Sequence, residues 1–167
     1  APLTITATTS SASEVYGATN PTFSFTSSGL KNSESISSVT KTFTGTGSYT
    51  STDAPSNVGS YTITPSGAVF DAGSASNYTI TYATVAYEIT KANQTVLWSP
   101  TTTYQTTSKP VTWSSEATGY GAITYAVTTA GSIHCSIVDG KLTWDNAATG
   151  SCVVTASAAG DENYNPG

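Results

Sequence analysis

The stretch Tyr78-Thr79-Ile80-Thr81-Tyr82 alternates bulky apolar side chains with threonine, and this two-residue period recurs along most of the chain. Leu3-Thr4-Ile5-Thr6 repeats the period near the start, and Tyr61-Thr62-Ile63-Thr64 repeats it further along. Successive side chains of a strand point to opposite faces of a sheet, so each stretch can bury one face and expose hydroxyl groups on the other. The pattern therefore predicts an all-β fold built from antiparallel strands.

The second half of the chain repeats this pattern of short strands separated by turn residues. The expected strands are 95–98, 111–113, 123–127, 133–137, 142–144 and 152–156. Asp139-Gly140 is a hairpin signal between two of them, because Gly adopts positive φ at no steric cost. Strands at this spacing favour a sandwich.

A domain boundary is expected at Lys91-Ala92-Asn93, where a new alternating strand begins, as one does after Ala1-Pro2. We predict two small tandem antiparallel β domains, residues 1–92 and 93–167. The second is expected to be an Ig-like sandwich, and the first a sandwich or β-grasp-like domain with at most one short helix, a single turn over 32–39. The joint lacks Gly, Ser or a long polar run, so we expect a short, restricted linker and an end-to-end arrangement.

The amino-acid composition limits which binding partners and which cellular compartment are expected for this protein. The net charge is −5, with five Lys and no Arg, which argues against nucleic-acid binding. No run of about 18 apolar residues is present, so we expect no membrane insertion. Only 9 % of the residues are charged, as is common in exported surface repeats. Because no initiator Met precedes Ala1, we expect a piece of a longer protein. The composition favours a protein that is secreted or displayed on a cell surface.

The two cysteines, Cys135 and Cys152, lie close together in strand-like segments. In an exported chain such a pair is interpreted as one disulfide, and the alternative is two buried free thiols. A disulfide closing a loop of this size stabilises a domain by about 3 kcal/mol on the chain-entropy estimate.

Candidate chemistry is sparse, and we predict no catalytic residue, no cofactor and no enzyme activity. His134, the single histidine, lies in an alternating segment, where a strand-face residue is the default interpretation. Asp161-Glu162-Asn163 forms a local oxygen-rich cluster. These residues are weak candidates for calcium, which takes six to eight oxygen ligands, and the alternative is a polar turn.

Two further kinds of chemistry stay open on the sequence. The tryptophans Trp98, Trp113 and Trp144 could form an exposed sugar-binding platform, although aromatic residues among apolar neighbours usually fill a core. The residue types needed for Lys–Asn isopeptide or Thr–Gln ester cross-links are present, including Gln94 and Gln105. Their spacing in the sequence, however, carries no signature of such a cross-link.

The first domain also resembles a known repeat. The pieces that carry the resemblance are Leu3-Thr4-Ile5-Thr6-Ala7, Val15-Tyr16-Gly17, Asn20-Pro21, Phe23 with Phe25, Ser28-Gly29-Leu30, residues 56–67, Asn77-Tyr78-Thr79-Ile80 and Ile89-Thr90-Lys91-Ala92. In this order they resemble the MBG repeat of large bacterial surface proteins. The chain departs from the usual Asn-Gly of the repeat at Asn32-Ser33 and at Thr84-Val85, and the second departure puts a tight turn there in doubt.

The second domain resembles the bacterial Ig-like repeats that end in a Gly-Asp/Asn-x-x-Tyr motif. The carriers are residues 121–125, the cysteine pair, and Ala159-Gly160-Asp161-Glu162-Asn163-Tyr164. Both resemblances imply a structural stalk module of an adhesin or fibre, and the alternative is a module that binds a carbohydrate or host ligand. Expected partners are neighbouring β domains of the parent chain and a glycan or protein ligand. We expect a monomer.

Overall fold

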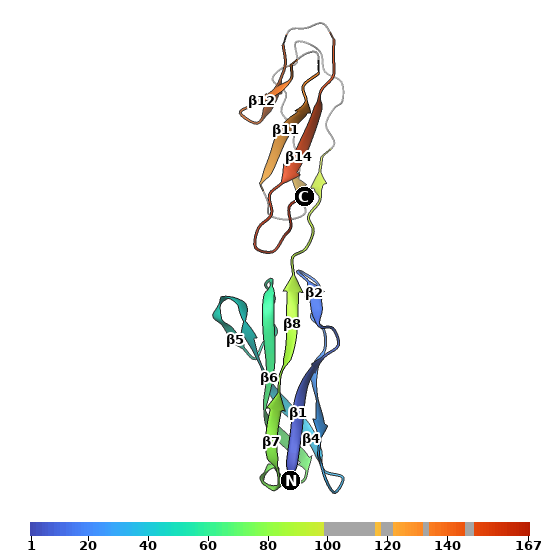
Figure 1. The fold of residues 1–167 in the computed structure, drawn as a ribbon, viewed down its shortest axis with the longest axis vertical. Coiled ribbons are helices and arrows are strands. Elements are labelled where there is room, and N and C mark those ends of the chain that lie inside the picture. The colour runs from blue at the N-terminus through green and yellow to red at the C-terminus, as the bar shows by residue number, and fades with distance from the viewer. Residues whose placement is uncertain (99–115, 118–121, 132–133, 146–148) are drawn as a thin grey trace. The chain divides into compact units, whose positions relative to one another are not determined.

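A computed structural model describes residues 1–98, 116–117, 122–131, 134–145 and 149–167. The chain divides into two compact units, Ala1–Lys91 and Ala92–Gly167 (Figure 1). Apart from two short 3-10 turns, every regular element in the described ranges is a strand, which confirms the all-β prediction. Within these ranges no helix has the length and apolarity needed to cross a membrane.

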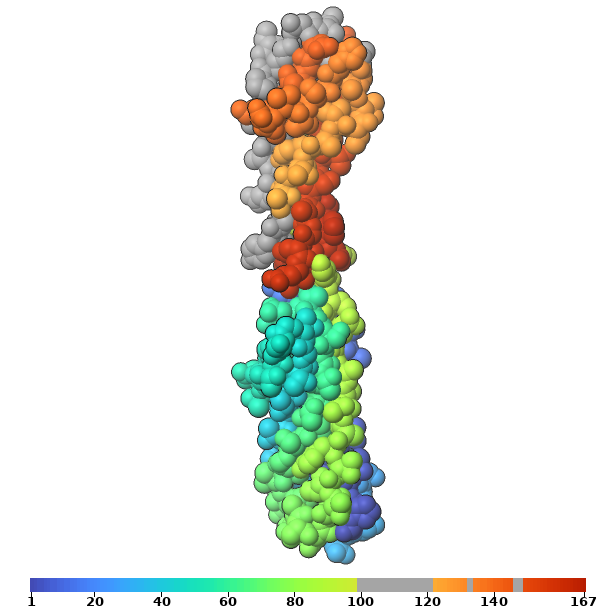
Figure 2. Space-filling model, turned by 60° about the vertical axis from the view of Figure 1, so that its left-hand side comes forward, coloured from blue at the N-terminus to red at the C-terminus, as the bar shows by residue number. Residues whose placement is uncertain are grey.

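The first unit consists of two sheets. One sheet has the order β3-β1-β7, formed by Phe23–Ser28, Pro2–Thr9 and Thr79–Ala83. The other has the order β2-β8-β6-β4-β5, formed by Ser13–Val15, Val85–Thr90, Gly59–Ala72, Ser35–Gly45 and Tyr49–Ser51. The hairpin that ends in β5 passes through η1 (Thr46–Ser48), and Figure 2 shows its cyan chain standing out from the side of the unit.

The strands bury alternate side chains, as the two-residue period predicts. Leu3, Ile5 and Ala7 of β1 are buried, whereas the threonines between them are exposed or half-buried. The core has two clusters of buried residues. One contains Leu3, Ile5 and Val39; the other contains Ala7, Phe43, Tyr61, Ile63, Tyr87 and Ile89. Because β1 contributes to both clusters, this strand joins the two parts of the core.

Two strand pairs of the first unit are parallel, β1 with β7 and β2 with β8, although the sequence pattern predicted antiparallel strands. β7 and β8 form a nearly continuous strand, which leaves one sheet at Ala83 and joins the other at Val85. β1 pairs with its first part and β2 with its second part, and both run in the same direction as this strand. No tight turn forms at Thr84-Val85, in agreement with the departure from Asn-Gly noted there.

The predicted helical turn over 32–39 is wrong. The structure has a turn at Asn32-Ser33 followed by β4, which begins at Ser35. The register of β4 against β6 shifts three times between Ser35 and Thr40. These irregularities break the simple alternation, so Ile36 and Val39, three positions apart, both pack in the core and imitate a helical spacing. The second 3-10 turn, η2, lies elsewhere, at Ala75–Asn77.

Replacing Ser33 by Gly is expected to stabilise the first unit by about 0.5–1 kcal/mol. The Glu34 N–H donates to the Lys31 carbonyl across the turn, and both central residues have positive φ, +51° at Asn32 and +58° at Ser33. This is the type I′ turn, in which Gly relieves the strain of a side chain. Urea unfolding of Ser33→Gly measures the change. A variant no more stable than the parent would contradict this account of the turn.

The second unit contains three antiparallel strand pairs among its described residues. They are β9 with β10 (Val96–Leu97, Glu116–Ala117), β11 with β14 (Ile123–Thr129, Val153–Ala158) and β12 with β13 (Ser136–Val138, Lys141–Thr143). The hairpin predicted at Asp139-Gly140 is confirmed, with φ of +50° and +72° at these two positions. The strand expected over 111–113 lies outside the described residues.

Candidate functional site

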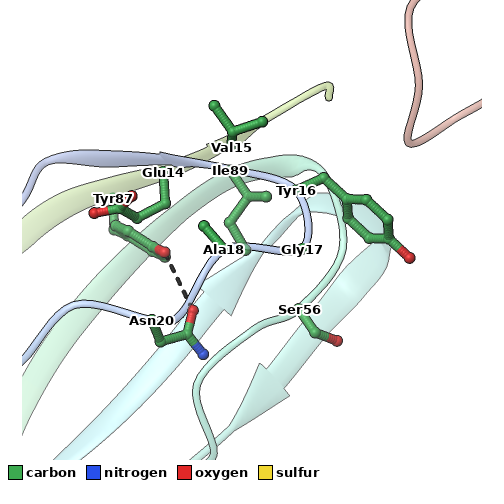
Figure 3. Close-up of a pocket in the computed structure, with 9 residues that line it drawn as sticks. All are labelled: Glu14, Val15, Tyr16, Gly17, Ala18, Asn20, Ser56, Tyr87 and Ile89. Carbon is green, nitrogen blue, oxygen red and sulfur yellow. Dashed lines mark hydrogen bonds between the residues drawn. The ribbon is translucent and has the colours of Figure 1, made fainter. Parts of the chain in front are cut away.

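A shallow hollow of about 180 Å³ lies beside the ends of β2 and β8 in the first unit (Figure 3). Its lining comes from three parts of the chain: Glu14, Val15, Tyr16, Gly17, Ala18 and Asn20; Ser56; and Tyr87 and Ile89. Pockets for drug-sized ligands usually hold about 300–1,000 Å³, so this hollow would accept only part of such a molecule. Polar side chains of β2 and β8 and of the loops that contain Asn20 and Ser56 nevertheless meet at this hollow.

A tight turn at Tyr16-Gly17 forms one wall of the hollow. The Ala18 N–H donates to the Val15 carbonyl at 3.0 Å, and Gly17 has a φ of +83°, the pattern of a type II turn. The Tyr16 N–H donates to the Thr90 carbonyl at 2.8 Å. This bond fixes the turn to the last residue of β8.

Tyr87 forms the floor of the hollow. Its side chain is 1 % exposed, and its hydroxyl donates to Oδ1 of Asn20 at 3.2 Å (Figure 3). Burial raises the pKa of Tyr87, and the nearby Glu14 carboxylate and the Tyr61 phenol raise it further. The Tyr87 phenol is therefore neutral at physiological pH and acts as a hydrogen-bonding group.

Comparison with known families matches residues 3–88 to the MBG domain (YGX type). The chain belongs to the MBG family. Within the matched residues, Tyr16-Gly17-Ala18 is the one Tyr-Gly-X tripeptide, and it is the turn that forms the wall of the hollow. MBG domains are non-enzymatic repeat modules associated with bacterial surface proteins. Neither the curated proteins nor the solved structures give a significant match to the chain.

Beyond the MBG domain, the predicted pairing of Cys135 with Cys152 is confirmed. The two form a disulfide whose Cα atoms lie 6.2 Å apart, across a sequence separation of 17. Cys135 is buried with Leu142 and Trp144 in the core of the second unit. A disulfide indicates an extracellular location, as does the MBG domain.

The Asp161-Glu162-Asn163 cluster forms a local turn in the structure. The Asp161 carboxylate accepts hydrogen bonds from the backbone N–H groups of Asn163 and Tyr164, at 2.8 and 2.7 Å. The Glu162 side chain is exposed. In the described part of the chain, no three His, Cys, Asp or Glu side chains come together in a way that could hold a metal ion.

Adding calcium or EDTA is expected to leave the melting temperature unchanged. The Asp161 carboxylate already accepts backbone donors, and one exposed carboxylate beside it offers few further ligands. A ligand raises stability only when it binds the folded state in preference to the unfolded one. Scanning calorimetry with calcium and with EDTA measures this, and Asp161→Asn is the matched control. A shift of many degrees that disappears in this variant would restore the calcium assignment.

The other candidates from the sequence are dispersed. Nδ1 of His134 lies 2.9 Å from Oδ2 of Asp145, and both side chains are exposed. Trp144 is buried, Trp98 is half-buried against Tyr125, and Trp113 lies outside the described residues, as does Gln105. Every Trp, Tyr and Phe in the described ranges is at least half-buried, so these residues provide no exposed aromatic platform.

Alkaline pH is expected to destabilise the MBG domain in part through Tyr78. The Tyr78 hydroxyl donates to Oε2 of Glu34 at 2.5 Å, and this hydrogen bond raises the pKa of Tyr78 above its ordinary value of 10.0. A raised folded-state pKa gives stability that is complete below pH 10 and is lost as the pH rises through the folded pKa. Urea midpoints of the parent and Tyr78→Phe between about pH 8 and 11 measure the loss. An equally steep decline in the variant would contradict this role.

Proposed function

We propose that the chain is a non-catalytic spacer from the stalk of a bacterial cell-surface adhesin or fibre. The observation that supports this most is the path of the MBG domain. Pro2 lies beside Thr79, and from there the chain runs on in the same direction to Thr90. Eleven steps of a strand cover about 36 Å, so the chain enters and leaves this domain at opposite ends. Each copy of this domain in a string of domains therefore adds its own length to the stalk.

The burial of the aromatic side chains supports the same function. A sugar platform needs exposed rings, whereas the large apolar side chains most exposed in the described ranges are aliphatic: Val15, Val69, Leu97, Val138 and Val153. On this proposal the second unit is an Ig-like repeat, the molecule is a monomer, and its partners are the neighbouring β domains of the parent chain.

Small-angle scattering tests the spacer function. A single globule of this length has a radius of gyration of about 15 Å. A spacer with a short, restricted joint should give a clearly larger value and no change with concentration. A radius close to that of one globule would contradict the proposal.

The alternative function, binding of a glycan or host protein, is favoured by the hollow at Tyr16-Gly17-Ala18. Its polar groups, Glu14, Asn20 and the Tyr87 hydroxyl, could bind part of a sugar ring or a peptide. A glycan array and immobilised host matrix proteins, probed with the parent and with Asn20→Ala, separate the two functions. The spacer function expects no specific signal. Binding that Asn20→Ala abolishes would establish the alternative.

A further inference from the structure

The two ends of the MBG domain are held together in one parallel ribbon. The register of β1 with β7 runs from Pro2 beside Thr79 to Thr6 beside Ala83. The register of β2 with β8 then runs from Ser13 beside Glu88 to Val15 beside Thr90. The first and last segments of the domain therefore run side by side in the same direction over most of their length.

Hydrogen bonds secure this ribbon at both ends. At its beginning, the Thr79 N–H donates to the Ala1 carbonyl at 2.8 Å. At its end, the Tyr16 N–H donates to the Thr90 carbonyl at 2.8 Å, and the Thr90 hydroxyl donates to the Glu14 carbonyl at 3.2 Å. Where the register of β2 with β8 begins, the Glu88 N–H donates to the Ala12 carbonyl at 3.0 Å.

We propose that this ribbon is a mechanical clamp, which gives the domain a second function: resistance to stretching along the stalk. The inference rests on the proposed spacer function, since only a module within a string is pulled at both ends. Tension at the two ends draws parallel neighbours past each other, so all the hydrogen bonds between them bear the force together. Antiparallel terminal strands would instead open one bond at a time from the end.

The core opposes the same sliding motion. Leu3 and Ile5 are 1 % and 0 % exposed, and they alternate with threonines along β1. A shift of one residue along β7 would turn the apolar side chains of β1 toward solvent and the threonines toward the core. Slippage therefore requires the hydrogen bonds and the core contacts of β1 to be lost at once.

Single-molecule pulling in two directions tests the clamp on the full chain. One attachment is a handle at the N-terminus, and the other is a maleimide linkage to Lys91→Cys, which shears the ribbon. In the matched control, the second attachment is at Ala75→Cys, an exposed position in η2 close to the start of the ribbon, which peels β1 from β7. Cys135 and Cys152 are joined in a disulfide and do not react with maleimide.

The end-to-end attachment is expected to give a several-fold higher unfolding force than the Ala75→Cys attachment. Release of roughly 300 Å of chain identifies unfolding of this domain in the end-to-end geometry. Melting temperatures equal to that of the parent show that both variants fold, and Asn77→Cys replaces Ala75→Cys if that variant does not. Equal forces, or a lower force from end to end, would overturn the clamp.

Different experiments would contradict the proposed clamp and the proposed spacer function. Equal forces in the two directions leave the scattering result and the spacer function untouched. Conversely, a glycan or matrix ligand lost in Asn20→Ala would replace the spacer function, while a large difference between the two pulling directions would still show that the ribbon resists shear.

Discussion

Reduction of the Cys135–Cys152 disulfide is expected to lower the stability of residues 92–167 by about 2–4 kcal/mol and to leave residues 1–91 unchanged. The bridge closes a loop of 17 positions, and a cross-link restricts the unfolded chain more than the folded one. Both cysteines also pack against the cluster of Leu142 and Trp144, so breaking the bridge loosens that core. The MBG domain contains no cysteine and should not respond.

Scanning calorimetry of the oxidised and reduced protein measures this effect. Two transitions should be fitted, because the chain contains two compact units. The double variant Cys135→Ser, Cys152→Ser is the control, since added reductant should change it no further. Thiol titration of the unreduced, denatured protein comes first. Two free thiols there, or a loss of stability shared equally by both transitions, would contradict the prediction.

Replacing Gly29 by Ala is expected to destabilise the MBG domain by about 3 kcal/mol. Gly29 has a φ of +112°, which strains any residue with a side chain. A Cβ at this position would also lie 2.5 Å from the Pro2 carbonyl oxygen and 3.3 Å from the Leu3 Cα. Both contacts are with the backbone of β1, which is held on its other side by β7, so relief requires the central strand of the sheet to move.

Gly17→Ala separates the two causes. Gly17 also has a positive φ, of +83°, but a Cβ there would meet nothing within 4 Å. Its expected cost is the backbone strain alone, about 1 kcal/mol. Urea unfolding of the two variants, followed by tyrosine fluorescence, gives both values. Equal losses would show that the approach of Gly29 to β1 contributes nothing.

The two-residue period predicted where the strands of the MBG domain lie far better than it predicted which strands pair with each other. β1 and β7 lie where the alternation placed them, because burial of every second side chain is a local property of a strand. The parallel pairing of Pro2 with Thr79 is not local, and nothing in either stretch specifies its neighbour. The error at 32–39 has a similar origin, since the irregular register of β4 depends on its contacts with β6.

The candidate sites were predictable to different degrees. The disulfide followed from two cysteines in an exported composition, whereas Val15-Tyr16-Gly17 was recognised only as part of the resemblance to the MBG repeat. The hollow itself was missed. Asn20, Ser56 and Tyr87 lie far apart in the sequence, and only the folded sheets bring them to the same place.

The long sequence separation between β1 and its parallel partner β7 also has a consequence for biogenesis. The N-terminal amino group of Ala1 donates to the Asn77 carbonyl, 76 positions further along the chain. A chain that emerges from its N-terminus first therefore exposes β1 long before β7 is available to pair with it. Contacts so distant in sequence also slow folding. The MBG domain should consequently stay unfolded until nearly all of its residues have been made, and β1 should find its parallel partner only then.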